Sequence, residues 1–350
     1  MAIEFSERLR RIPVYPAADA YAVPDDVAMM ASNESPDPPL PAVVEAVSRV
    51  LGSVNRYPDP SNSRLRAALS DRYGVPANRI AIGNGSVEIL MAAGEALLEP
   101  GAEFVYAWPS FSVYPHLAAA SGATEIRVPL DGDERHDLAA MAREITVATR
   151  LAIVCNPNNP TSTALPLDEI AAFVAEVPRS VAVILDEAYC EFNTLDDPDA
   201  SLDLLKRHPN LVLLRTFSKI YGLCGSEAFR TAVDQVRQPF FCNAAAQAAA
   251  LEALNHQDEV TRRVERNLAE RIGLEDGLRE LGIEPAQSQA NFLWFDLGDG
   301  REEAEIMQQL AQRGVLVRAG SSLGREGALR VTVGTQAENE RFLEALAALL

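Results

Sequence analysis

The chain contains very little lysine. Lys206 and Lys219 are its two lysines among 350 residues, and arginine carries the rest of the basic charge. Acidic residues number 50 against 31 lysines and arginines, so the formal net charge is -19. This charge argues against sequence-independent binding to nucleic acid or to an anionic membrane surface. No apolar run is long enough to span a bilayer, so we expect neither a nucleic-acid nor a membrane partner.

Cysteine is scarce as well. The four cysteines are Cys155, Cys190, Cys224 and Cys242. Their spacing matches neither a metal site nor a disulfide framework, so we expect no metal. Cys155 and Cys190 fall at the ends of expected buried strands, where small apolar residues fit. Residues 1–7 lack the basic and apolar regions of a signal peptide. We therefore expect a reducing, cytoplasmic location.

The length is sufficient for a large core and two domains. Residues 1–40 are rich in proline, alanine and aspartate, and this composition indicates an extended N-terminal arm. We expect a large domain over residues 41–255. Residues 256–350 would form a small C-terminal domain, to which the arm contributes.

In the large domain, short apolar runs alternate with amphipathic patterns. This alternation predicts an α/β fold whose mostly parallel sheet is covered on both faces. The expected strands are Arg79–Ile82, Glu103–Ala107, Thr124–Val128, Leu151–Cys155, Val181–Leu185 and Leu211–Leu214. The expected helices are Pro41–Leu51, Ser63–Tyr73, Val87–Leu98, Ser112–Ala120, Leu138–Val147 and Leu167–Ala175.

The C-terminal part follows a different pattern. A helical region over Ala232–Leu281 precedes an arrangement that indicates a small α+β domain. The expected strands there are Asn291–Asp296, Val315–Arg318 and Leu329–Val333, and the expected helices are Arg301–Arg313 and Gln336–Leu349.

Lys219 stands just after the last expected strand of the large domain, in the run Thr216-Phe-Ser-Lys219. Lysine can form a Schiff base with an aldehyde, which arginine cannot do. From this run alone, a lysine that holds a carbonyl cofactor and a surface lysine after a strand are equally well supported.

Three other expected strands also end in polar or glycine residues, and in an open parallel sheet chemistry gathers beyond the carboxyl ends of the strands. Gly83, Gly85 and Ser86 follow the first strand. They would let the backbone approach an anion at a helix N-terminus, although a tight strand-to-helix turn also explains them.

Two further strand ends carry amide and acidic groups. Asn159 lies between prolines that would fix its amide, although Asn-Pro also occurs in ordinary turns. Asp186 ends a buried apolar strand. An acid in that position needs a cationic partner such as a protonated pyridine nitrogen, or else it caps a helix. Tyr189, three residues on, could reach the same ligand.

Together, these strand ends resemble those of pyridoxal-phosphate aminotransferases of fold type I, and most closely the histidinol-phosphate aminotransferase branch. The resemblance covers nearly the whole chain and implies that fold and that cofactor. The matching motifs are Ala31-Ser-Asn33-Glu34-Ser35-Pro, Arg56-Tyr57-Pro-Asp59, Asn158-Asn159-Pro-Thr161, Asp186-Glu-Ala-Tyr189, Thr216-Phe-Ser-Lys219, Val236-Arg-Gln-Pro-Phe240 and Leu329-Arg330-Val-Thr-Val-Gly334.

The resemblance implies a role for each matching residue on the cofactor. Lys219 would form the Schiff base and later move a proton. Asp186 would keep the ring nitrogen protonated, so that the ring becomes an electron sink. The remaining cofactor-binding residues would be Asn159 and Tyr189 at the phenolic oxygen, Phe111 stacked on the ring, and Gly85, Ser86, Val87, Thr216 and Ser218 around the phosphate.

The resemblance also implies substrate and subunit contacts. Arg330 would clamp the substrate carboxylate in the bidentate geometry that arginine favours. Asn33 and one of Tyr15 or Tyr21 would line the substrate side. Tyr57 would reach the cofactor phosphate of the neighbouring subunit, so the resemblance implies a homodimer.

One stretch departs from the family, which continues after the lysine as Lys-x-x-Gly-Leu-Ala-Gly-Leu-Arg-Val-Gly-Tyr, with an arginine that binds the cofactor phosphate. Here Glu227 stands where that arginine belongs. A segment of roughly nine residues, including a core strand, is missing between Leu223 and Cys224. Either the segment is disordered, which would leave a chain break at this junction, or the chain lacks it and the phosphate site is weakened. We favour disorder, because losing an interior strand should be severe for the fold.

A smaller departure is Ser162, which stands where glycine is usual. Serine is unfavourable there if the backbone requires a positive φ.

The expected function is therefore aminotransfer between a small-molecule amino donor and a 2-oxo acid. Histidinol phosphate with 2-oxoglutarate, in histidine biosynthesis, is the first expectation, and an aromatic amino acid is the alternative. An amino acid phosphate decarboxylase or an impaired cofactor-binding protein has less support, because Lys219, Asp186 and Arg330 are all present.

Overall fold

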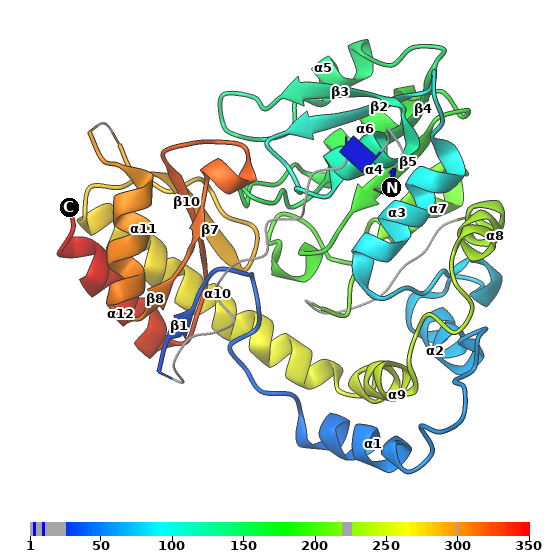
Figure 1. Ribbon diagram of the computed structural model, residues 1–350, viewed down its shortest axis with the longest axis horizontal. Coiled ribbons are helices and arrows are strands. Elements are labelled where there is room, and N and C mark those ends of the chain that lie inside the picture. The colour runs from blue at the N-terminus through cyan, green and yellow to red at the C-terminus, as the bar shows by residue number, and fades with distance from the viewer. Residues whose placement is uncertain (1–2, 5–8, 11–25, 219–225, 299) are drawn as a thin grey trace.

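The computed structural model describes residues 3–4, 9–10, 26–218, 226–298 and 300–350. A five-stranded sheet forms the centre of the larger part, and the smaller part holds a three-stranded sheet and a two-stranded one (Figure 1). Within the described ranges, no helix is both long and apolar enough to cross a membrane. The proposed division at residues 40 and 255 stays a prediction.

The central sheet is parallel over its described strands, which lie in the order β3-β2-β4-β5-β6. They are β2 (Glu103–Trp108), β3 (Thr124–Pro129), β4 (Thr149–Cys155), β5 (Ala182–Asp186) and β6 (Leu211–Leu214). Successive side chains alternate between two apolar clusters, with Val183 and Leu185 in one and Ile184 in the other. Because strand side chains have a period of two, these apolar runs need cover on both faces.

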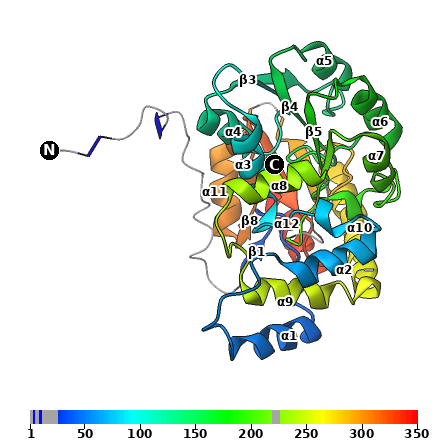
Figure 2. The ribbon, with the colours of Figure 1, turned by 90° about the vertical axis from the view of Figure 1, so that its right-hand side faces the viewer.

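Helices provide that cover. One cluster receives side chains from α2 (Ser63–Tyr73), α5 (Leu138–Arg143), α6 (Leu167–Glu176), α7 (Leu202–Arg207) and α9 (Ala244–Ala253). The other receives them from α3 (Gly85–Leu97), α4 (Tyr114–Ser121) and α8 (Glu227–Val236). Outside this layer, α1 (Pro41–Leu51) packs on α9, at the bottom of Figures 1 and 2.

The smaller part contains an antiparallel sheet of β7 (Phe292–Asp296), β10 (Ala328–Thr332) and β9 (Arg318–Ala319). Near the start of the chain, β1 (Ala28–Met29) pairs in parallel with β8 (Val315–Leu316). The enclosing helices are α10 (Gln257–Glu280), α11 (Glu303–Gln312) and α12 (Gln336–Ala347), and the 3-10 turn η5 (Ser321–Leu323) lies before β10. Residues 28–29 of the expected N-terminal arm thus pair with a strand of the C-terminal part.

The prediction of a strand over Arg79–Ile82 is wrong. Ala77–Arg79 form a 3-10 helix, η3, and residues 80–82 pair with no described strand. Ile80 and Ile82 are nevertheless buried in the same cluster as Leu213 of β6. A strand requires a hydrogen-bonded neighbour. The apolar pattern of this run therefore reports its burial, whereas no described strand lies beside it to pair with.

Two other expectations concern residues after β6. The sequence runs directly from Leu223 to Cys224 without the expected segment, and the chain break predicted at this junction stays a prediction. Both residues lie outside the described ranges. The helical region expected over Ala232–Leu281 is divided among α8, α9 and α10. The break before α9 occurs where the Asn243 side chain caps the helix by accepting from the Ala246 N–H at 2.8 Å.

Candidate active site

A cavity of about 360 Å3 opens where β4 and β5 end, facing the N-terminus of α3 and the strands β9 and β10. This volume suits a small molecule. The predicted site residues that line it are Asn33, Gly85, Ser86, Val87, Phe111, Asn159, Asp186, Tyr189, Thr216, Ser218 and Arg330. Residues from distant parts of the sequence therefore meet at one place.

Asp186 is the last residue of β5 and is 2% exposed. The Tyr114 hydroxyl donates to its Oδ2 at 2.8 Å, and the Ala188 N–H donates to its Oδ1 at 3.3 Å. Burial raises the pKa of Asp186 to about 6, although both hydrogen bonds act in the opposite direction. A buried acid of this kind binds a cationic partner favourably, because the partner restores the stabilisation that water would give to the charge.

The loop after β4 is held by a buried hydrogen-bond network centred on Asn158. Its Oδ1 accepts from Ser110 Oγ at 2.8 Å and lies 3.1 Å from Nε2 of His136. Its Nδ2 donates to Thr161 Oγ1 at 2.8 Å. Burial lowers the pKa of His136 to about 4, so the imidazole is neutral near pH 7 and donates from Nε2. This network fixes the loop that carries Asn159.

Arg330 on β10 spans the gap between the two parts of the molecule. Its Nη1 donates to Asn159 Oδ1 at 2.7 Å, and its Nη2 donates to the Ala31 carbonyl at 2.6 Å. The guanidinium lies 5.4 Å from the ring centroid of Phe292. Arg318 on β9 stands in register beside it and lines the same cavity. The cavity therefore has a cationic wall that can receive an anionic substrate group.

The other end of the cavity is formed by backbone and hydroxyl groups. A side chain at position 83 would require Ile89 to move, because a Cβ on Gly83 would lie 2.8 Å from Cγ1 of Ile89. Gly85 has a φ of +74, and a Cβ on it would lie 3.9 Å from Ser218 Oγ. Ser86 lies in the first turn of α3, which begins at Gly85, and Thr216 also lines the cavity. Helix N–H groups and hydroxyls of this kind suit an anion such as phosphate.

Four predicted residues are not among the described residues that line the cavity. Tyr57 is 82% exposed and stacks on Phe240 with ring centroids 4.4 Å apart. Lys219, Tyr15 and Tyr21 lie outside the described residues. Ser218, directly before Lys219, lines the cavity.

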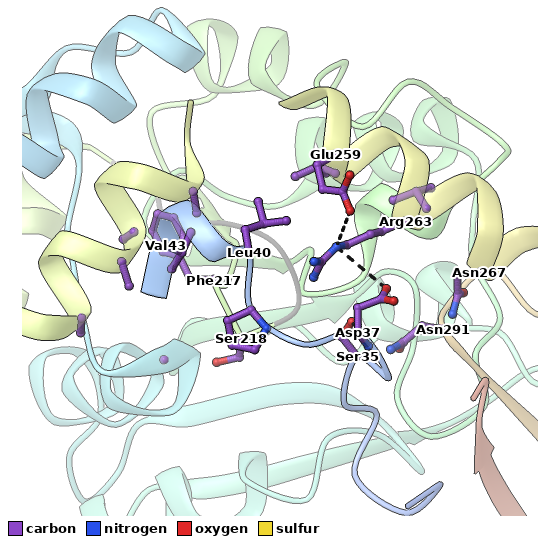
Figure 3. Close-up of a pocket in the computed structure, with 18 of the residues that line it drawn as sticks. Ser35, Asp37, Leu40, Val43, Phe217, Ser218, Glu259, Arg263, Asn267 and Asn291 are labelled. Carbon is purple, nitrogen blue, oxygen red and sulfur yellow. Dashed lines mark hydrogen bonds and ion pairs between the residues drawn. The ribbon is translucent and has the colours of Figure 1, made fainter. Parts of the chain in front are cut away.

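A second cavity, of about 660 Å3, shares Gly85 and Ser218 with the first. Figure 3 shows Arg263 on its polar side, paired with Glu259 at 3.2 Å and with Asp37 at 3.9 Å. Ser218 also adjoins residues 219–225, which are outside the described ranges. We therefore assign no ligand to this second cavity.

Sequence reasoning missed three contributors to the site. Tyr114 is buried on α4, where its pattern is that of an ordinary core residue. His136 lies next to a turn, and nothing in its spacing distinguishes it from other polar loop residues. Arg318 offered the best signal, because it is a charged residue at the end of an expected strand.

The residues present fit pyridoxal phosphate. Asp186 would hold its ring nitrogen, Asn159 and Tyr189 its ring oxygen, and the Gly85–Ser86 turn its phosphate. When bound, this cofactor supplies an electron sink for a carbanion beside an amino group. The glycine and hydroxyl groups that line one end of the cavity, and the buried acid Asp186, are observations of this chain that agree with such a ligand.

Comparisons with known proteins agree with this fit. Residues 25–346 match the model of the family "Aminotransferase class I and II". An aromatic amino acid aminotransferase of Cutibacterium acnes is 41% identical over 97% of this chain and 96% of its own. A histidinol-phosphate aminotransferase of Geobacillus thermodenitrificans is 39% identical over 99% and 98%.

A solved structure adds to this. The histidinol-phosphate aminotransferase of Sinorhizobium meliloti in complex with pyridoxal-5'-phosphate superposes with a TM-score of 0.82 at 26% identity, covering 92% of this chain and 91% of that one. The predicted α/β fold and cofactor are confirmed. The chain belongs to the class I and II aminotransferases of fold type I, which use pyridoxal phosphate.

Proposed function

We propose that this aminotransferase acts on aromatic amino acids, with 2-oxoglutarate as the acceptor of the amino group. The observation that carries the proposal is the pairing of Arg330 with apolar walls in one cavity. Ala31, Ala188 and Leu323, which have no assigned role at the cofactor, line that cavity together with Arg330. An aromatic amino acid offers a carboxylate for the guanidinium and a flat apolar ring for the walls.

Histidinol phosphate, the first expectation from sequence, is kept as the second candidate. Arg318 beside Arg330 gives the cavity a second cation, which suits a phosphate dianion. Two cations also suit the two carboxylates of 2-oxoglutarate, so Arg318 alone does not favour either donor. Relatives named for each activity differ by only two percentage points of identity, 41% and 39%.

A half-reaction separates these candidates. The cofactor-loaded chain is mixed with phenylalanine, tyrosine or histidinol phosphate, and the long-wavelength absorbance of the bound cofactor is followed. We expect rapid loss of absorbance with phenylalanine and tyrosine. Loss with histidinol phosphate alone would move the assignment to the second candidate. Release of carbon dioxide would contradict aminotransfer altogether.

For the reaction, we propose that Lys219 holds the cofactor and moves the proton at the substrate's Cα. Asp186 keeps the ring nitrogen protonated, and Asn159 and Tyr189 hold the ring oxygen. Phe111 packs on the ring, and Gly85, Ser86, Thr216 and Ser218 bind the phosphate. Val87 continues that turn but is 41% exposed. Arg330 binds the substrate carboxylate.

We further propose that the chain acts as a homodimer in which Tyr57 reaches the neighbouring cofactor phosphate. Tyr57 does not line its own cavity, and exposed Val44, Leu51 and Val54 on and after α1 give that face an apolar surface. A mixing experiment tests this arrangement. Chains with Lys219→Ala and chains with Tyr57→Ala should each have little activity. Mixed dimers should regain activity, because one of their two sites then has both residues. Mixed dimers without activity would contradict the crossing.

A further inference from the structure

Asn33 occupies a fixed position between the two parts of the molecule. It is 1% exposed and has a φ of +53, a left-handed conformation that asparagine tolerates better than most residues. Its N–H donates to Thr332 Oγ1 at 2.9 Å, and its carbonyl accepts from Asn291 Nδ2 at 3.2 Å. Both backbone groups are therefore bound by the C-terminal part, and the side chain is directed across the boundary.

The hydrogen bonds of Thr332 determine how the Asn33 amide is turned. The Thr332 hydroxyl accepts the Asn33 N–H and gives its one proton to Asn33 Oδ1 at 3.2 Å. Thr332 is 2% exposed, so a hydroxyl proton without an acceptor would be costly there. With Oδ1 facing Thr332, the Nδ2 group faces Tyr189 and donates to its Oη at 3.0 Å.

This orientation assigns the direction of the bond at Tyr189. The amide Nδ2 can only donate, so the phenol oxygen accepts and keeps its own proton. Among the described residues, no second partner of the Tyr189 hydroxyl is found, and both Tyr189 and Asn33 line the cavity. The proton is left to be donated into the cavity, where Asn159 and Arg330 also end.

We propose that Asn33 is a positioning residue, which turns the Tyr189 hydroxyl so that it donates its proton to the ring oxygen of the cofactor. From the sequence, Asn33 was expected to line the substrate side of the site, and this role is different. The inference rests on the cofactor that the family uses and not on the proposed substrate. It also links Tyr189 to β10, because Thr332 lies two residues from Arg330 on that strand.

The electrostatics support the same direction. Burial raises the pKa of Tyr189 to about 12, while the charge of Arg330 and the bond from Asn33 act to lower it. A phenol that accepts a hydrogen bond becomes a better donor through its own proton, because bonds in a chain polarise one another. Asn33 therefore strengthens the bond that Tyr189 can make to an anionic oxygen.

The test uses the full-length, cofactor-loaded chain and needs no substrate. The pH titration of the bound cofactor's absorbance is compared for wild type, Asn33→Asp, Tyr189→Phe and the double variant. Aspartate has nearly the shape of asparagine, but when ionised its side chain can only accept hydrogen bonds. The bond is therefore reversed, and the Tyr189 hydroxyl donates to residue 33 and no longer into the cavity. We expect Asn33→Asp to raise the apparent pKa of the absorbance change by about one unit, as a lost charge-assisted bond would. Tyr189→Phe should give a similar shift, and the double variant should add little to it.

Two controls separate positioning from folding. Asn33→Ala removes the donor without adding charge and should shift the titration in the same direction. Asn291→Ala weakens only the anchor at the Asn33 carbonyl, so it should lower thermal stability with a smaller shift. Unfolding of the cofactor-free chains is measured in parallel. A variant that loads cofactor poorly is compared instead by its Kd for pyridoxamine phosphate, followed by tryptophan fluorescence, with about a tenfold weakening expected.

Two outcomes would overturn the proposal. Asn33 variants that lose stability but titrate and bind like wild type would show a purely structural role. Asn33 variants whose effect is just as large in the Tyr189→Phe background would show that Asn33 does not act through Tyr189. Either result leaves the substrate assignment untouched, because that assignment is tested by the half-reaction.

Discussion

At the ends of β4 and β5, the groups that face the cavity are buried and tied to one another, whereas those between α3 and β6 are more exposed and have fewer contacts. Asp186 is 2% exposed and accepts two hydrogen bonds. Ser218 is exposed, and its described hydrogen bond is from its N–H to Thr216 Oγ1 at 3.1 Å. One end of the site is thus held rigidly, and the other borders the junction where the chain lacks a segment.

This contrast indicates which parts of a cofactor site can be lost separately. The ring end depends on strand ends that are all present. The phosphate end would ordinarily also use an arginine from the missing segment, as the family resemblance implies. The arginines that line the described cavity, Arg318 and Arg330, are on β9 and β10, and Arg330 is bonded to the ring-end residue Asn159. We therefore expect changes at the ring end to impair chemistry, and changes at the phosphate end to alter cofactor retention.

The largest effect should come from Asp186→Ala. Removing one partner of a buried ion pair costs several kcal/mol, so we expect kcat/KM to fall by about 10³-fold. The matched control is Tyr114→Phe, which removes one hydrogen bond to the carboxylate and keeps its charge. Steady-state kinetics at saturating cofactor should show a much smaller loss for the control. Equal losses would contradict the role of the carboxylate charge.

In the cofactor-free chain, the free energy of unfolding should depend on pH, because ionising the buried Asp186 destabilises the folded state. The folded pKa of Asp186 is about 6 against an ordinary 3.8, so the folded state binds more protons between these values. Stability therefore falls as the pH rises through this range, by about 3 kcal/mol in total. Asn cannot ionise, so Asp186→Asn should escape this loss.

The measurement is urea unfolding of both chains at about pH 4 and about pH 7.5. The variant should gain about 2.5 kcal/mol on wild type between the two conditions, because the ordinary pKa of 3.8 means that part of the total has already been lost at pH 4. His136 has the opposite effect. Its folded pKa is about 4 against an ordinary pKa of 6.5, so the folded state loses stability as the pH falls below 6.5. That contribution is common to both chains and cancels in the difference. A difference that does not vary with pH would contradict the raised pKa.

Much of this arrangement could be predicted from sequence, and the exceptions have physical causes. Strands such as Leu211–Leu214 were predicted because apolar runs between turns report burial directly. Arg79–Ile82 has the same pattern but is not a strand, since strand formation also depends on a neighbour elsewhere in the chain. The hydrogen bond between His136 and Asn158 was missed for a related reason. Their role depends on contacts between loops 22 residues apart, which local patterns do not reveal.

The phosphate end can be tested by restoring what is missing. A segment that contains Gly-Leu-Arg-Val-Gly-Tyr is inserted between Leu223 and Cys224. A control insert has the same sequence with alanine in place of the arginine. We expect the arginine insert to bind pyridoxal phosphate about tenfold to thirtyfold more tightly than the alanine insert, as a charge-assisted bond to phosphate would provide. The alanine insert shows the effect of the strand alone. Equal affinities for the two inserts would mean that the phosphate does not need the arginine.

The smallest effect concerns strain at the rigid end, at Ser162. This residue is fully buried and has a φ of +61. The sequence had raised this possibility, because the family usually has glycine at this position. The Ser162 N–H donates to the Asn158 carbonyl at 2.8 Å and its carbonyl accepts from the Gln289 N–H at 2.7 Å, so the conformation is imposed by the surroundings. A left-handed residue costs about 1–2 kcal/mol, and glycine relieves this while adding about 0.5–1 kcal/mol of unfolded-state entropy.

Ser162→Gly should therefore stabilise the chain by at most about 1 kcal/mol, measured by urea unfolding at neutral pH. Ser162→Ala is the matched control, because it removes the same hydroxyl, which donates to the Thr161 carbonyl at 2.5 Å, and keeps the strain. The glycine variant should be more stable than the alanine variant. If alanine were as stable as glycine, the left-handed conformation would cost no more than the unfolded-state entropy that glycine adds, which is below the expected range of strain. If glycine is more stable and kcat/KM is unchanged, the hydrogen bonds to Asn158 and Gln289 are sufficient to hold the loop, and the strain at Ser162 is a cost that the site does not require.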